Sequence, residues 1–152
     1  MNIVLHEPEI PANTGNIGRT CAAAGIWLHL IKPLGFSTDD KQLKRAGMDY
    51  WHLVNVQYYD DFNDFILKND NPRLFLATTK GSRRYTDVDY GDDPYIVFGK
   101  ESAGLPAEIR EAYPDSCIRI PMMTGKRSLN LGNAAAVVIY EALRQQGFKG
   151  LI

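Results

Sequence analysis

Short apolar runs recur along the chain and predict the strands of a single sheet. They are rich in valine, isoleucine, leucine and aromatic residues, and most of them do not alternate with polar positions. That pattern is typical of strands buried on both faces of a parallel sheet. The predicted strands are residues 3–5, 27–31, 53–58, 74–78, 95–98 and 117–120.

The stretches between these runs predict helices. Ser37 and Thr38 are good N-caps for one helix, Pro106 suits the first position of another, and Gly147 suits the end of the last. The predicted helices are residues 16–24, 39–46, 60–68, 106–112 and 130–146. Strands that alternate with helices indicate an α/β fold, here a mainly parallel sheet flanked by helices. We expect one domain over residues 1–152, because no linker or repeat interrupts this alternation.

The composition changes this picture little. The chain has 152 residues, of which 45% are hydrophobic and 23% charged, as in an ordinary soluble domain. The N-terminus lacks the features of a signal peptide, and no apolar run reaches the roughly 20 residues that cross a bilayer. We therefore expect a cytoplasmic protein without a membrane partner. Cys21, Cys117 and the three scattered histidines show no metal-ligand spacing, so we expect buried thiols and no metal.

The net charge of −1 gives no global signature of a nucleic-acid binder. Basic residues nevertheless gather in three places, at Lys41, Lys44 and Arg45, at Lys80, Arg83 and Arg84, and at Lys126 and Arg127. Each cluster fits an ordinary solvated face, and each also fits a local patch that binds phosphates.

Three polar, glycine-containing segments follow predicted strands and lead into helices. They read PANTGNIGR (residues 11–19), FGKESAGLP (98–106) and PMMTGKRSLNLGN (121–133). In an α/β sheet this is the carboxyl edge of the strands, where ligands bind. The common nucleotide fingerprints are absent, because Gly15 and Gly18 give only GxxG. Leu105 and Pro106 also stand where a P-loop needs lysine and serine or threonine.

The side chains of these segments suit anion and cofactor binding. Asn13, Asn16 and Arg19 lie at a predicted helix start, where free N–H groups and a guanidinium can hold a phosphate. A helix cap with a surface ion pair explains them equally well. Glu101, between two glycines, is available to orient Arg19 or to accept a proton, unless it is only an exposed acid in a turn. Ser128, Asn130 and Asn133 cluster at the start of the last helix.

Together these segments resemble the motifs of the SPOUT superfamily of methyltransferases, in the same order along the chain. The likeness includes the opening IVLHEPEIPANTGNIGRT, the segment KRAGMDYW and the ending IRIPM…SLNLGNA, and it covers nearly the whole chain. It implies a deep C-terminal trefoil knot, a homodimer and bound S-adenosylmethionine. It also implies methylation of the ribose 2'-oxygen of the wobble nucleotide of tRNA (position 34), a cytidine or a modified uridine. Alternatives are a ribose methyltransferase of another tRNA or rRNA site, a non-catalytic RNA-binding relative, and a small-molecule nucleotide-binding protein.

The resemblance also implies roles for individual residues. The expected cofactor contacts are Ala77, Thr78, Gly99, Glu101, Gly104, Ile120, Met122, Ser128, Leu129 and Asn133. The expected catalytic residues are Asn13, Arg19, Glu101, Ser128 and Asn130. The basic clusters, together with Arg19, supply the expected contacts to the anticodon loop, which are Arg19, Lys41, Lys44, Arg45, Lys80, Arg83 and Arg84. Proposals for the family make the first-motif arginine the base. We expect Arg19 instead to stabilise the alkoxide and anchor a phosphate, because a guanidinium with a pKa above about 12 is a poor base.

Overall fold

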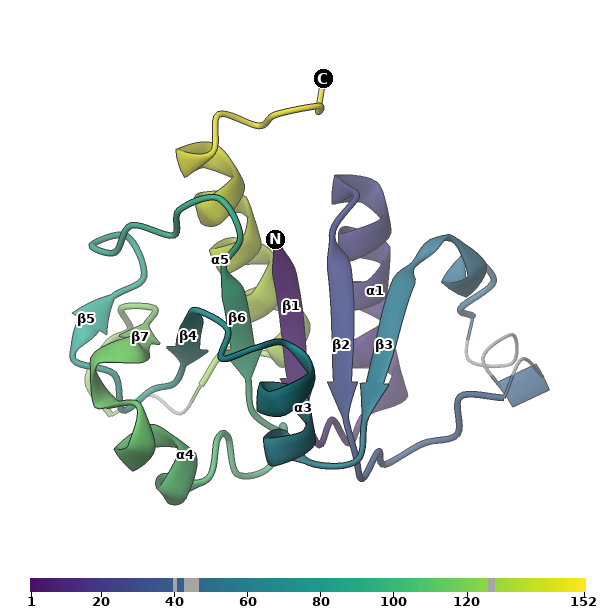
Figure 1. Ribbon diagram of the computed structural model, residues 1–152, viewed down its shortest axis with the longest axis horizontal. Coiled ribbons are helices and arrows are strands. Elements are labelled where there is room, and N and C mark those ends of the chain that lie inside the picture. The colour runs from purple at the N-terminus through teal and green to yellow at the C-terminus, as the bar shows by residue number, and fades with distance from the viewer. Residues whose placement is uncertain (40, 43–46, 126–127) are drawn as a thin grey trace.

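In the part of the chain that the structure describes, seven parallel strands form one sheet in the order β3-β2-β1-β6-β4-β7-β5 (Figure 1). The computed structural model describes residues 1–39, 41–42, 47–125 and 128–152. The strands are β1 (Asn2–His6), β2 (Trp27–Ile31), β3 (Asn55–Tyr59), β4 (Leu74–Ala77), β5 (Arg83–Arg84), β6 (Tyr95–Phe98) and β7 (Cys117–Arg119). The predicted parallel sheet is confirmed. The trefoil knot stays a prediction.

Helices cover both faces of the sheet (Figure 1). On one face α1 (Pro11–Ala24) packs beside α5 (Leu131–Gln145), and on the other lie α3 (Phe62–Lys68) and α4 (Ala107–Ala112). Short 3-10 helices span Trp51–Leu53 and Pro114–Ser116. In β1, Ile3 and Leu5 join the core under α1 and α5, whereas Val4 joins the core under α3. Burial on both faces explains the continuous apolar runs.

The structure departs from the predicted elements at the start of α1 and at β5, and one further predicted helix is largely untested. Helix α1 begins at Pro11 rather than residue 16, because Pro11 takes the first helical position, where its missing N–H costs nothing. Strand β5 was missed, since two arginines carry no apolar pattern. The helix predicted over residues 39–46 falls mostly outside the described residues.

Cysteine, metal and membrane expectations can be compared with the described residues. Cys21 and Cys117 are buried free thiols, and burial raises the pKa of Cys21 to about 12. The described part of the chain contains no group of three side chains able to hold a metal ion. Within those same residues, no helix combines the length and the apolar character that crossing a membrane requires.

A buried polar network lies beneath α3 and centres on His29. Its Nδ1 is 2.7 Å from the Tyr59 hydroxyl oxygen and its Nε2 is 3.2 Å from Asn2 Oδ1. The Asn2 amide in turn donates to Asp93 at 2.8 Å. His29 is only 3% exposed, and burial lowers its pKa from 6.5 to about 4. The fold therefore holds this imidazole neutral.

This network predicts a specific loss of stability in mild acid. The unfolded chain binds a proton on His29 below pH 6.5, whereas the folded chain does so only near pH 4, so stability falls as the pH drops through that window. The expected contribution is about 2 kcal/mol between pH 7 and pH 5, measured by urea unfolding. In His29→Gln this contribution to the change in stability between pH 7 and pH 5 should be absent. In His52→Gln, which changes an exposed histidine, it should remain. An unchanged pH dependence in His29→Gln would contradict the assignment.

Candidate cofactor and active site

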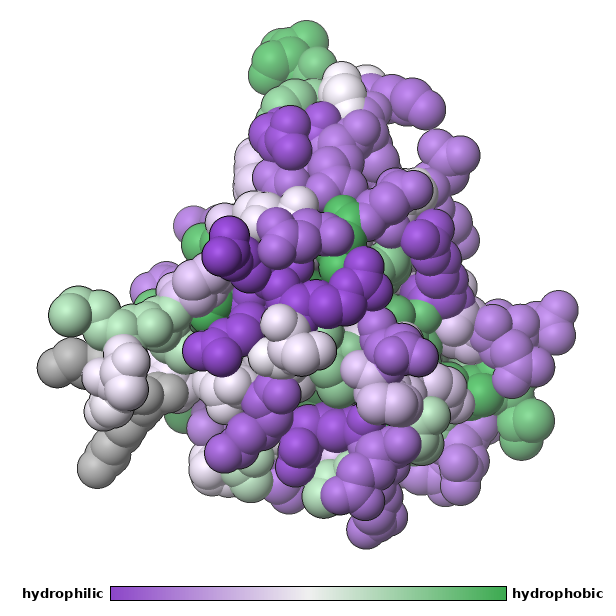
Figure 2. Space-filling model, turned by 90° about the vertical axis from the view of Figure 1, so that its left-hand side faces the viewer, coloured by the Kyte–Doolittle hydropathy of each residue, from purple (hydrophilic) through white to green (hydrophobic). Residues whose placement is uncertain are grey.

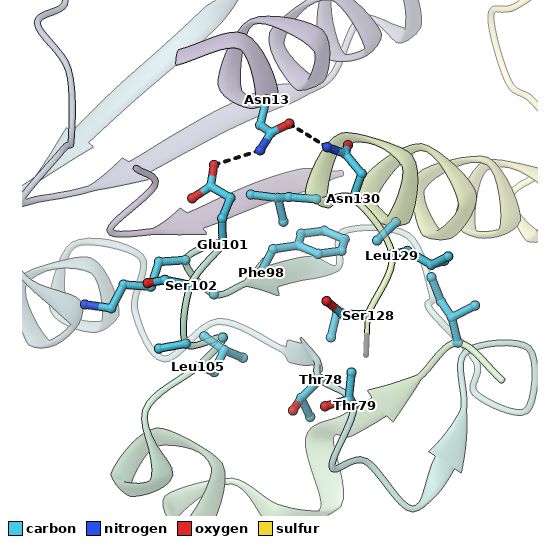
Figure 3. A pocket seen from close by; sticks show the side chains of 18 of the residues that line it. Asn13, Thr78, Thr79, Phe98, Glu101, Ser102, Leu105, Ser128, Leu129 and Asn130 are labelled. Carbon is cyan, nitrogen blue, oxygen red and sulfur yellow. Dashed lines mark hydrogen bonds between the residues drawn. The ribbon is translucent and has the colours of Figure 1, made fainter. Parts of the chain in front are cut away.

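A cavity of about 780 Å³ opens at the carboxyl ends of β4, β6 and β7 (Figure 3). Its walls come from the loop after β4, the loop after β6, two residues beyond β7 and the start of α5. Asn13 closes the cavity from the first turn of α1. This is the sheet edge at which the sequence predicted a ligand site.

Most of the predicted site residues line this cavity. They are Asn13, Ala77, Thr78, Gly99, Glu101, Gly104, Ile120, Met122, Ser128, Leu129 and Asn130. Neither Asn133 nor Arg19 is among the lining residues. Asn133 is exposed, and its backbone N–H donates to Asn130 Oδ1 at 3.2 Å, which caps α5. Helix α5 instead contributes Leu131 and Ala134 to the wall.

Several lining residues were missed by sequence reasoning. They are Ile10, Thr79, Phe98, Lys100, Ser102, Ala103, Leu105, Arg110, Leu131 and Ala134. Phe98 ends β6, so its position at a strand end was an available signal. Arg110 gave none, because it reaches the wall only through the packing of α4, where its Nε donates to the Leu105 carbonyl at 3.2 Å.

The loop after β6 folds back on itself, and this explains its two glycines. The Gly104 N–H donates to the Lys100 carbonyl at 2.8 Å, and Gly104 has a φ of +70°, which favours glycine. A Cβ on Gly99 would lie 2.0 Å from the carbonyl carbon of Gly104 and 2.1 Å from the Leu105 nitrogen. Gly99 therefore shapes the loop through its own returning backbone.

The Glu101 carboxylate joins this loop to the start of α1. It accepts hydrogen bonds from the backbone N–H groups of Glu9 (2.8 Å) and Ile10 (3.1 Å), and from the Asn13 amide (3.0 Å). The three donors occupy both carboxylate oxygens and satisfy a negative charge close to a helix N-terminus. The sequence led us to expect that Glu101 orients Arg19 or accepts a proton. In the structure its side-chain partner is instead Asn13.

Asn13 passes this connection on to α5. The Asn130 amide donates to Asn13 Oδ1 at 2.9 Å, so both ends of the buried Asn13 amide are occupied (Figure 3). Asn130 Oδ1 accepts from the N–H of Asn133 and so begins α5. One chain of hydrogen bonds therefore runs from the loop after β6 across α1 to α5.

Two further carboxylates tie the β1–α1 connection to the same loop. Glu9 accepts from the backbone N–H and the hydroxyl of Ser102, both at 2.9 Å. These hydrogen bonds lower the pKa of the Glu9 carboxyl. Glu7 pairs with Lys100 at 2.9 Å, which raises the pKa of that lysine. The contacts of Glu9 and Glu101 are reciprocal, so the two loops hold each other in place.

Arg19 lies on α1 away from the cavity wall. Its guanidinium carbon is 4.6 Å from the centroid of the Tyr50 ring. Within the part of the chain that the structure describes, no carboxylate lies within 4 Å of it. Within the described residues, the predicted active-site arginine therefore stacks on an aromatic ring and has no carboxylate partner.

The predicted RNA-binding cations lie in different surroundings. Lys80 lines the cavity, whereas Arg83 and Arg84 form β5 at the edge of the sheet. Figure 2 shows hydrophilic residues gathered across the face that carries β5 and β7. Arg84 is 3.9 Å from Asp87, a weak exposed pair. Lys41 is exposed, and Lys44 and Arg45 lie outside the described residues.

The residues of the cavity fit S-adenosylmethionine. Phe98, Leu105, Ile120 and Leu129 give apolar walls for a nucleobase, and the hydroxyls and amides between them suit a ribose and an amino-acid tail. The volume falls in the range of small-molecule and cofactor sites. A parallel α/β fold with such a pocket at a strand edge is typical of proteins that bind a nucleoside cofactor.

The sequence comparison assigns the family. The sequence profile of the SpoU rRNA Methylase family matches residues 1–140, and the chain belongs to this family. It is 50% identical over 153 residues to the tRNA (cytidine(34)-2'-O)-methyltransferase of Escherichia coli K12, covering 100% of this chain and 98% of the relative. It is 51% identical over 158 residues to the Yersinia pestis protein of the same name, with coverage of 100% and 98%.

Solved structures agree with the sequence relatives. A structure described as giving insight into the 2-OH methylation of C/U34 on tRNA matches with a TM-score of 0.89 and 42% identity, covering 96% of this chain and 95% of that one. An AdoMet-bound rRNA methyltransferase from Sinorhizobium meliloti matches with a TM-score of 0.78 and 28% identity, covering 94% of this chain and 55% of that one.

The folded-back loop predicts unequal effects at its two glycines. In Gly99→Ala the new methyl group must displace backbone, so affinity for S-adenosylmethionine should fall about 10- to 100-fold. In Gly104→Ala the Cβ meets open space and only the positive φ is unfavourable, so the loss should stay below about 10-fold. Titration calorimetry on the folded variants measures both. Wild-type affinity in Gly99→Ala would show that the loop does not need this close return.

Proposed function

We propose that the protein transfers the methyl group of S-adenosylmethionine to the ribose 2'-oxygen of the wobble nucleotide of tRNA. The observation that carries this proposal is that Asn13, Glu101, Ser128 and Asn130, from three separate segments, meet at one cavity. The full-length relatives named for this activity support the choice of substrate.

The protein's own contribution is mainly positioning. S-adenosylmethionine supplies a methyl group on a sulfonium, which is already a good leaving group, so the two reacting atoms must chiefly be aligned. Asn13 has both amide ends engaged and positions the loops around the cofactor. The Ser128 hydroxyl lines the cavity and makes no hydrogen bond within the described residues, so it is the group that orients the ribose.

The hydroxyl proton leaves as the 2'-oxygen attacks. Both oxygens of Glu101 already accept hydrogen bonds from three donors, so we assign Glu101 a positioning role. Arg19 stabilises the negative charge that develops on the 2'-oxygen, because a guanidinium is a good hydrogen-bond donor to an anion and Arg19 has no carboxylate partner among the described residues. A phosphate oxygen of the RNA or a water molecule takes the proton.

Basic residues around the cavity bind the RNA. Lys80 at the cavity wall and Arg83 and Arg84 on β5 contact phosphates of the anticodon loop, whose unstacked nucleotides a compact domain can reach. We place Lys41, Lys44 and Arg45 in the same role. Affinity for tRNA then falls as salt rises, because each phosphate contact releases counterions.

The protein acts as a homodimer in the cytoplasm. Val137 and Tyr140 on α5 are 39% and 50% exposed, and a second copy packed on this side of α5 covers them. Helix α5 also borders the cavity, so the subunit interface lies close to the active site. Arg19, which is outside the cavity wall of its own chain, lies on the neighbouring helix α1.

The test of this function is the position of the methyl group. Purified protein is incubated with unmodified tRNA and labelled S-adenosylmethionine, and the product is digested with nuclease and mapped by mass spectrometry. We expect one methyl on the ribose 2'-oxygen of nucleotide 34. A methyl on a base, in another loop, or only on ribosomal RNA would refute the substrate assignment and leave the cofactor assignment standing.

A further inference from the structure

Residues 48–51 pack against α1 next to Arg19. The Tyr50 hydroxyl donates to the Gly15 carbonyl, and the face of the same ring lies 4.6 Å from the guanidinium carbon of Arg19. Gly15 and Arg19 are four residues apart and lie one above the other on the helix. The Tyr50 side chain is therefore fixed at the turn of α1 that contains Gly15, and its ring covers the Arg19 guanidinium on the next turn.

The two glycines of the first motif make room for this segment. A Cβ on Gly15 would lie 3.2 Å from the Tyr50 hydroxyl and from Met48 Sδ, and a Cβ on Gly18 would lie 2.9 Å from the Trp51 ring. Glycine is unfavourable inside a helix, so its presence at both positions needs a cause. Contact with residues 48–51 supplies that cause and links the segments NTGNIGR and AGMDYW.

We infer that Tyr50 is the positioning residue of Arg19 in methyl transfer, holding the guanidinium by its aromatic face. This inference rests on the proposed function, in which Arg19 stabilises the charge on the 2'-oxygen. A ring face attracts a cation without cancelling its charge, whereas a carboxylate partner would neutralise the group that the reaction needs. Arg19 has no such carboxylate partner among the described residues.

The surroundings of Tyr50 suit this role. Its ring is half-buried, and Met48 in the same segment is 3% exposed and lies with Tyr50 against Gly15. Burial raises the pKa of the Tyr50 phenol, and the charge of Arg19 together with a hydrogen bond from its side chain offsets only part of that shift. The ring therefore stays neutral at physiological pH and acts through its π face.

A double-mutant cycle separates positioning from simple packing. Single-turnover methyl transfer to tRNA is measured for Tyr50→Leu, Tyr50→Phe, Arg19→Ala and the Tyr50→Leu, Arg19→Ala double variant. Tyr50→Leu should lower the rate about 2- to 30-fold with cofactor affinity unchanged, and Tyr50→Phe, which keeps the ring, should restore most of it. In the Arg19→Ala background Tyr50→Leu should have no further effect.

Trp51→Leu is the matched control, since Trp51 packs on Gly18 and makes no cation–π contact with Arg19. Its effect on the rate should be the same with and without Arg19. A Tyr50→Leu effect that persists fully in Arg19→Ala, or an unchanged rate in Tyr50→Leu, overturns the inference.

A readout without catalysis keeps the inference separate from the proposed function. The ring of Tyr50 should shift the NMR resonances of the Arg19 side chain upfield in the wild type and in Tyr50→Phe, and this shift should vanish in Tyr50→Leu. Absence of the shift in the wild type overturns the inference. A normal shift in a protein that never methylates tRNA shows instead that the proposed function has failed.

Discussion

The carboxylate of Glu101 joins segments that lie about 90 residues apart in the chain. Its three donors lie on the β1–α1 connection and on α1, and the last of them, Asn13, extends the chain of hydrogen bonds to Asn130 at the start of α5. A charged acceptor with several N–H donors is among the stronger hydrogen-bond arrangements in proteins. The cavity keeps its shape because this group fixes two of its walls relative to each other.

This arrangement divides the work among the polar residues of the motifs. Asn13 and Glu101 use their hydrogen-bonding groups on each other and on backbone, so they shape the site. Among the described residues, the Ser128 hydroxyl at the cavity makes no hydrogen bond and the Arg19 guanidinium on α1 has no carboxylate partner, so these are the groups that we propose contact the substrate. Three glycines allow close packing between these segments, because a Cβ at any of them would meet neighbouring atoms. Gly99 accommodates its own loop, and Gly15 and Gly18 accommodate residues 48–51.

Much of the fold was predictable, because buried parallel strands leave continuous apolar runs such as the one in β6. The convergence of the three motifs was also predictable, since each follows or trails a strand and parallel strands end at one edge. The contacts that explain why individual residues occupy their positions were not predictable. No local pattern shows that Glu101 binds backbone 92 residues away, that Arg19 stacks on Tyr50, or that Gly99 faces Leu105. These depend on contacts between segments distant in sequence, as does the two-residue strand β5.

The most direct test of Glu101 as a positioning group is the isosteric change Glu101→Gln. The new amide hydrogens must face an N–H donor of Glu9, Ile10 or Asn13, so one hydrogen bond is lost. Two measurements distinguish a positioning role from the role of proton acceptor. They are the hydrogen exchange of the Glu9 and Ile10 amides and the pH dependence of single-turnover methyl transfer. We predict exchange about 5- to 150-fold faster and a slower reaction whose pH profile keeps its shape. Unchanged exchange, with methyl transfer reduced to a slow residual rate that no longer depends on pH, would instead identify Glu101 as the proton acceptor.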